Sequence, residues 1–368
     1  GLEKLKEQQG FLCDDWRRLR DYYLVDAFAY RKSKVAIQDV ALTAGALPTS
    51  LLEACELGSG EYDAKALLMA LYGRSPDLLR LVFHLDKVHK SGFARMRLQK
   101  PPRAPDHSFR EFATPRAIAD LLAEHDDSLR DRRRCELKRI HAVGDEHLLI
   151  FVRRPYRNRH ILSENVEAAA GQHVVHGYSP EWIVLDFYDN ARSLGICSSS
   201  NDVPMDLANL FASRYFQNDC EYANECLTTY PAQIERLLGA LKENRCEGLG
   251  LLQFQLRQAP FKGSTPLKVG PADPSAIGKA AADLEANFGP LFSDIGNVEK
   301  IKVEYRQKKV EMRFEAEEAA AESGAPVYVV RYFDHRLNLE QRYAFEAFMR
   351  SEHGIEVLST EKRFKRKS

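Results

Sequence analysis

The sequence lacks the long apolar run of roughly 20 residues that a membrane-spanning helix needs. Its first residues, Gly1-Leu2-Glu3-Lys4, also lack the basic-then-apolar order of a secretory signal peptide. Only seven cysteines are scattered over 368 residues, an odd number without the spacing of a disulfide framework. We therefore expect a protein of the cytoplasm or the nucleus, neither secreted nor held by a membrane, with reduced thiols.

Motifs of the common enzyme chemistries are missing as well. Lys262-Gly263-Ser264-Thr265 has the residue types of a P-loop in the wrong order, and Gly248-x-Gly250 has no third glycine for a dinucleotide fingerprint. The chain has no Cys-x-x-Cys pair, and His173 and His176 would point to opposite faces of a strand. The sequence therefore predicts neither cofactor nor metal site, and it favours a binding or assembly subunit over an enzyme.

Net charge is absent too, because 53 Lys and Arg residues balance 53 Asp and Glu residues. No global field can hold a polyanion, so binding by charge requires a local patch. The content of 44% hydrophobic and 29% charged residues is that of a globular protein, and the length suggests two or three domains.

The first 92 residues have the pattern of short helices, because apolar residues recur at steps of three and four. Within them, residues 35–55 have the spacing of a helix-turn-helix, with Ala41 and Gly45 four apart and Leu51 as the apolar anchor of the second helix. That second helix lacks the Arg, Lys, Asn and Gln side chains that most often contact base edges. An ordinary helical bundle or protein-docking domain is the alternative.

A basic, proline-containing segment at 93–113 is predicted to be a linker, because its prolines cannot continue a helix. Thr114-Pro115 then indicates the start of a helix that extends to about residue 126. Two hairpins follow, one turning at Gly144 between strands 134–143 and 147–152, the other turning at 189–191 between strands 182–188 and 192–197. We expect an α+β domain over 114–218.

A second α+β domain is predicted over 219–368. Asn338 and Gln341 have the spacing of a capping box for a helix that ends before Gly354. The other elements predicted from residue 203 onward are helices at 203–216, 230–241 and 274–288 and strands at 249–256, 298–305, 309–314, 327–333 and 355–359. The predicted class is α+β, an N-terminal all-helical domain followed by mixed or antiparallel sheets.

Positive charge is concentrated around the first hairpin. Ten Lys and Arg residues between 130 and 160 face only four Asp and Glu residues, a local excess of about six charges. Arginine forks beside an aromatic ring suit phosphate contact and base stacking. The nucleic-acid-binding residues that this predicts are Arg132, Arg133, Arg134, Lys138, Arg139, Arg153, Arg154, Tyr156, Arg157 and Arg159, together with Arg31, Lys32 and Lys34 near the N-terminus.

Two alternatives remain open for function. The arginines can instead form a solvated surface or contact a protein partner, which would make the chain an interaction scaffold of a larger complex. Glu136-Leu137-Lys138 also has the local form of a metal-dependent nuclease, although the preceding acidic residues lie at a helix end. The basic tail, residues 362–367, would suit either phosphate contact or nuclear import. DNA or RNA is the partner that we favour.

Overall fold

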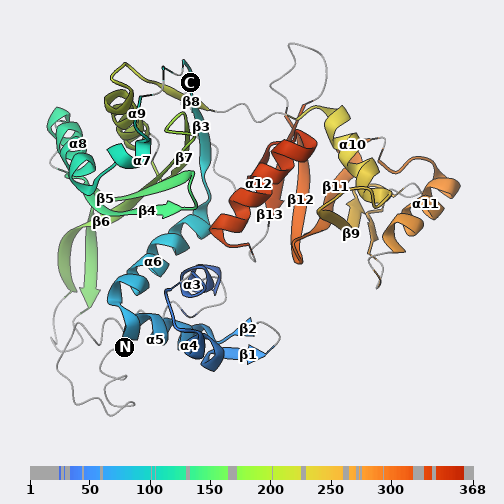
Figure 1. The fold of residues 1–368 in the computed structure, drawn as a ribbon, viewed down its shortest axis with the longest axis horizontal. Helices are drawn as coiled ribbons and strands as arrows, with labels where there is room; N and C mark the ends of the chain where they lie inside the picture. Colours follow the sequence, from blue (N-terminus) through green and yellow to red (C-terminus); the bar gives the residue numbers. More distant parts are fainter. Residues whose placement is uncertain are drawn as a thin grey trace. The chain divides into compact units, whose positions relative to one another are not determined.

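The structure is a computed structural model that describes Val25, Ala29 and residues 34–359. The gaps within that range are 44, 59–60, 101, 104, 130–132, 165–171, 201, 225–228, 260–264, 271–272, 274–275, 293, 318–326 and 334–336. The chain divides into two compact units. The split unit combines Gly1–Lys90 with Thr228–Ser359, and the inserted unit is Ser91–Leu227 (Figure 1).

The first part of the split unit is mainly helical. Leu67, Leu68 and Leu71, at steps of one and three along α5, are fully buried, as the apolar spacing of the sequence predicts. The region also contains a short hairpin between residues 56 and 62, so it is not all helical as predicted. Its elements are α3 (Lys34–Ala41), α4 (Thr49–Ala54), β1 (Glu56–Gly58), β2 (Glu61–Tyr62), α5 (Ala64–Arg74) and α6 (Pro76–Ser91).

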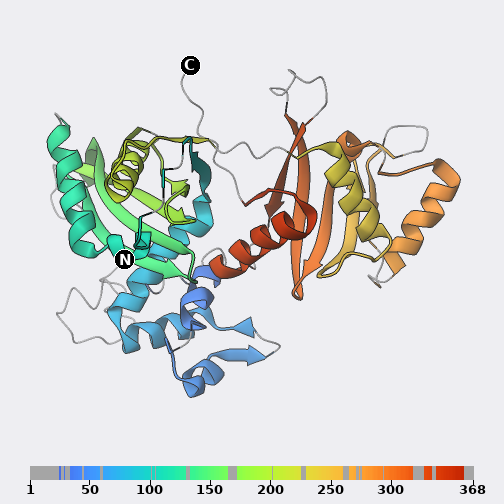
Figure 2. The same cartoon turned by 45° about the horizontal axis from the view of Figure 1, so that its top comes forward.

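The second part of the split unit is a six-stranded sheet in the order β10-β9-β11-β12-β13-β14, antiparallel except for the parallel pair β13 and β14. Buried side chains of three helices and of alternate strand positions form one core. Figure 2 shows α12 lying against this sheet. The elements are α10 (Pro231–Lys242), β9 (Leu249–Leu256), β10 (Leu267–Val269), α11 (Ile277–Phe288), the 3-10 turn η3 (Ile295–Asn297), β11 (Val298–Tyr305), β12 (Lys308–Glu317), β13 (Val327–Phe333), α12 (Leu339–His353) and β14 (Val357–Ser359).

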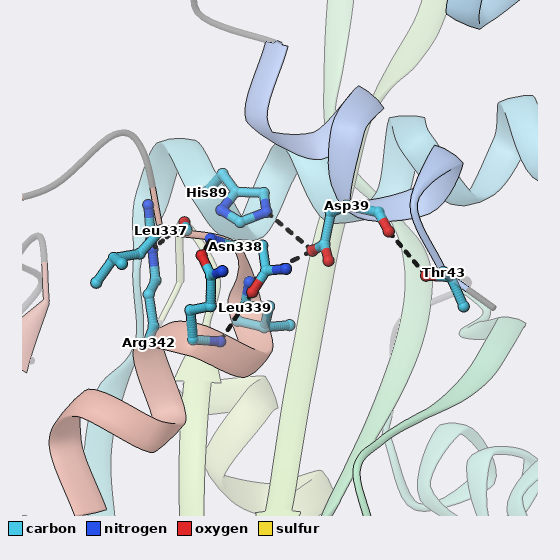
Figure 3. Close-up of polar contacts among 8 residues, drawn as sticks. Asp39, Thr43, His89, Leu337, Asn338, Leu339 and Arg342 are labelled. Atoms are coloured by element: carbon cyan, nitrogen blue, oxygen red, sulfur yellow. Dashed lines mark hydrogen bonds and ion pairs between the residues drawn. The ribbon is translucent and has the colours of Figure 1, made fainter. Parts of the chain in front are cut away.

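A partly buried polar contact joins the two parts of the split unit across 300 residues of sequence (Figure 3). Asp39 of α3 accepts a hydrogen bond from the backbone N–H of Leu339 at 3.4 Å, and its carboxylate lies 3.5 Å from Nε2 of His89 on α6. Burial lowers the pKa of His89, and Asp39 opposes that shift. The first turn of α12 is therefore held directly against α3.

The inserted unit has a six-stranded sheet in the order β4-β5-β6-β7-β3-β8 with α7, α8 and α9 packed on one face. The chain enters it through β3 and leaves through β8, and these two strands are antiparallel neighbours, with Met96 opposite Asn224. The elements are β3 (Ala94–Leu98), α7 (Phe109–Phe112), α8 (Pro115–Ser128), β4 (Glu136–Val143), β5 (His147–Glu164), β6 (Gln172–Tyr188), β7 (Ser193–Cys197), α9 (Asp202–Phe216) and β8 (Tyr222–Asn224).

Both predicted hairpins are confirmed. β4 and β5 pair across Gly144, whose φ of 59° is the left-handed conformation that glycine adopts without strain. β6 and β7 pair across the turn at 189–191. The α+β class is confirmed as well, with mixed and antiparallel sheets. The segment 93–113, predicted to be a linker, contains β3 and α7.

The described helices include none with the length and apolar character needed to cross a lipid bilayer.

Candidate nucleic-acid interface and metal-ligand group

Three of the predicted basic residues, Arg134, Lys138 and Arg153, lie at the open end of the β4–β5 hairpin, away from the Gly144 turn. Glu136, the first residue of β4, lies opposite Arg153 of β5, and a bulge follows at Lys138. The Glu136 carboxylate accepts hydrogen bonds from Nη2 of Arg153 at 2.8 Å and from Nζ of Lys138. The bond from Lys138 is the largest cause that lowers the pKa of Glu136, and the charge of Arg153 adds to it.

Two positive charges thus share one carboxylate, which leaves this hairpin end positive. The exposed Arg134 lies just before β4 and pairs with Asp127 at 2.7 Å. Side chains of Arg134 and Arg153 are 62% and 48% exposed, so both remain in contact with solvent. Arg133 and Arg139 are half-buried.

Arg154 does not belong to this surface. It is 2% exposed and lies opposite Glu181 of β6, which is also 2% exposed. The Oε1 atom of Glu181 accepts hydrogen bonds from the hydroxyls of Ser198 and Ser199 at 3.1 and 3.3 Å. The alternation of a strand places successive residues on opposite faces, which is why Arg153 is exposed and Arg154 buried. We leave Arg154 out of the proposed binding surface.

Strands β5 and β6 continue together beyond the rest of the sheet as a two-stranded ribbon (Figure 1). β4 pairs with β5 only as far as Arg153, and β7 pairs with β6 only from Val184 onward. Between these limits β5 and β6 pair with each other, down to Glu164 opposite Gln172. Tyr156, Arg157 and Arg159 lie on β5 within this ribbon, Arg157 opposite Ser179 and Arg159 opposite Gly177. Their side chains lie outside the described residues, as do those of His173 and His176.

The N-terminal basic residues are less informative. Lys34 is exposed at the first position of α3, and Arg31 and Lys32 lie outside the described residues, as does Arg132. Residues 35–55 do form two helices, but α4 has no buried residue, and Leu51 is 41% exposed instead of anchoring it. The helix-turn-helix hypothesis therefore loses the packing contact on which it depended.

One group of three side chains within the described ranges could hold a metal ion: His125, Asp126 and Cys135. One potential ligand atom from each lies within 4.8 Å of the others. His125 and Asp126 lie in the last turn of α8 and are 5% and 2% exposed, whereas Cys135 is half-buried just before β4. Asp126 Oδ2 accepts a hydrogen bond from the backbone N–H of Cys135 at 2.6 Å, which draws the two chain segments together.

Sequence reasoning missed this group, because His125-Asp126 and Cys135 have no spacing that marks a metal motif. The eight residues between Asp126 and Cys135 contain no second thiol or imidazole. Glu136, by contrast, is not in this group, so the predicted nuclease at Glu136 and Lys138 gains no group of three metal ligands from the described residues.

A second close pair of thiol and imidazole lies in the split unit, where Sγ of Cys246 is 3.4 Å from Nε2 of His353. Burial raises the pKa of Cys246 and lowers the pKa of His353. Both directions favour the neutral thiol and imidazole over the reactive thiolate and imidazolium. This pair has the electrostatics of a structural contact.

No protein-family model matches this sequence, and the search of curated proteins finds no match.

Proposed function

We propose that this chain is a non-enzymatic subunit that binds nucleic acid through the cationic end of the β4–β5 hairpin and the β5–β6 ribbon. The ribbon is the observation that supports the proposal most. It extends past the sheet, and β5 carries Arg157 and Arg159 beyond the exposed Arg153. The DNA major groove is wide enough for a two-stranded β-ribbon, and guanidinium groups match phosphate oxygens.

The ion pairs at the base of the ribbon are compatible with this binding. Exposed pairs such as Arg134 with Asp127 and Arg153 with Glu136 contribute only about 0–1 kcal/mol. A phosphate can therefore replace the carboxylate at little cost. Phosphate contacts release counterions and should dominate the affinity, with little discrimination between base sequences.

Fluorescence anisotropy of the full chain with short labelled single- and double-stranded DNA and RNA, over a salt series, tests the proposal. Arg157→Gln with Arg159→Gln should weaken binding and reduce the slope of log K against log salt by about 2 if both residues contact phosphates. The matched control is Arg236→Gln with Arg257→Gln, two exposed arginines of the split unit, which should leave the slope unchanged.

A second variant, Glu136→Gln, should change the affinity for nucleic acid in the opposite direction. It removes the carboxylate that Arg153 and Lys138 share, so binding should tighten several-fold at low salt. Glu235→Gln, an exposed position on α10, removes the same charge elsewhere and should have a smaller effect. Failure to bind any of the four nucleic acids at low salt would overturn the proposal and favour a protein scaffold.

A further inference from the structure

The geometry of His125, Asp126 and Cys135 carries an inference that is independent of nucleic-acid binding. The three ligand atoms lie no more than 4.8 Å from one another. An ion can therefore be placed within about 2.8 Å of all three, since 4.8 Å divided by the square root of 3 is about 2.8 Å. Zinc lies about 2.0–2.3 Å from nitrogen, oxygen and sulfur ligands. Small side-chain rotations would therefore bring all three ligand atoms to bonding distance of one ion.

The His125 imidazole gives a second, separate indication. Its Nδ1 atom lies 3.5 Å from Asp126 Oδ1, and its Nε2 atom is buried without a hydrogen-bond partner among the described residues. A buried polar atom without a partner costs about 1–3 kcal/mol, so binding of a ligand or water to that atom is favoured. A metal ion bound through Nε2 would satisfy this ring nitrogen.

The three ligand types select the metal. A thiolate, an imidazole and a carboxylate together suit a borderline-soft ion that accepts tetrahedral geometry, which is the preference of Zn²⁺. Mg²⁺ and Ca²⁺ prefer oxygen ligands only. Cys135 is not in a disulfide, so its sulfur can ligate once it loses its proton.

We propose that His125, Asp126 and Cys135 bind a zinc-like divalent ion with one coordination position left for water or another small ligand. The ion would tie the last turn of α8 to the start of β4. The connection between them includes the basic residues Arg133 and Arg134. The metal would thus fix the backbone that carries part of the cationic surface.

Cobalt(II) is the probe that tests this site in the full-length protein after treatment with a chelator. One equivalent of Co²⁺ should give the visible bands of tetrahedral cobalt and a near-ultraviolet thiolate-to-cobalt band, and Zn²⁺ should displace it. Cys135→Ser should abolish the thiolate band. His125→Gln should weaken binding by more than about 100-fold, beyond the effect typical of residues that only support a ligand.

Cys246→Ser and His353→Gln serve as matched controls, because they change the other close thiol and imidazole pair. Both should bind cobalt as the unchanged protein does. The cobalt spectrum of the unchanged protein tests the proposal even if a variant fails to fold. A wild-type spectrum without a thiolate band, or one that persists in Cys135→Ser, would overturn the proposal and leave His125 and Asp126 as a buried structural pair.

Discussion

Three consecutive non-glycine residues in the turn between β6 and β7 have left-handed backbone conformations. The φ angles of Asp189, Asn190 and Ala191 are 51°, 49° and 61°. Their neighbours stabilise this conformation, because Asn190 Oδ1 accepts a hydrogen bond from the backbone N–H of Phe109 and the carbonyl of Ala191 accepts one from Tyr222. Short polar side chains tolerate this region better than others do, which is consistent with Asp and Asn here.

Asp189→Gly should stabilise the protein by about 0.5–1 kcal/mol, because glycine adopts a positive φ without strain and the Asp189 side chain is exposed. Urea unfolding measures the change. Asp145→Gly, in the other hairpin turn but without a positive φ, should destabilise instead. Ala191→Gly should gain little, because its methyl group is fully buried. Equal effects at positions 145 and 189 would contradict the explanation.

At the scale of a helix, α12 has the ends that its sequence predicts. Asn338 Oδ1 accepts the N–H of Gln341 at 2.8 Å, and the Gln341 side chain accepts the N–H of Asn338 at 3.1 Å. Gly354 ends the helix with a φ of 65°, and its carbonyl accepts a hydrogen bond from Gln233 of α10. Local capping and tertiary contact therefore favour the same boundary.

Asn338→Ala should lower the free energy of unfolding by about 1 kcal/mol, since it removes one of the two reciprocal hydrogen bonds. Asn338→Asp keeps an acceptor oxygen and should change stability much less. Chemical denaturation of both variants separates loss of the cap from loss of side-chain volume. Equal destabilisation by Ala and Asp would show that the capping bond is not the cause.

Sequence patterns that span only a few residues predicted most of the helices and strands. β9 and β11 have the predicted bounds 249–256 and 298–305, and Thr114 caps α8 with Pro115 at its first position. The predicted strand 147–152 is shorter than β5, which extends to Glu164. Pro155 and the polar residues after it interrupt the apolar alternation that marks a strand. Pairing with β6 maintains β5 there instead.

The candidate sites were harder to predict, because they depend on contacts between elements. Charge density located Arg134, Lys138 and Arg153, but the burial of Arg154 depends on which strand face the helices cover. The metal-ligand group needs the end of α8 to approach the start of β4, a contact that no spacing in the sequence encodes.

At the scale of the molecule, buried histidines should make stability depend on pH. Burial lowers the pKa of both His89 and His353 in the split unit. The unfolded chain, with histidine pKa near 6.5, then binds more protons than the folded chain in mildly acidic solution. Stability should therefore be complete above about pH 7 and decline as the pH falls through and below 6.5.

Urea unfolding between pH 7.5 and 5.5 measures this decline. His89→Gln and His353→Gln should each reduce the dependence on pH, whatever their effect on stability at neutral pH. A slope unchanged by both substitutions would show that other groups cause the dependence.

The neighbouring strands β3 and β8 have a consequence for the order of folding during synthesis. Residues 91–227 leave the ribosome before the second part of the split unit, and their ends meet once β3 pairs with β8. Folding of this segment shortens an effective loop of 137 residues, counted from 91 to 227, to a short span. Asp39 and Leu339 are 300 residues apart, and 300 minus 137 leaves 163, so the loop that their contact closes is shortened by close to one halving. Each halving of a loop lowers its closure cost by about 0.6 kcal/mol. Early folding of the inserted unit would thus favour formation of the contact between α12 and α3.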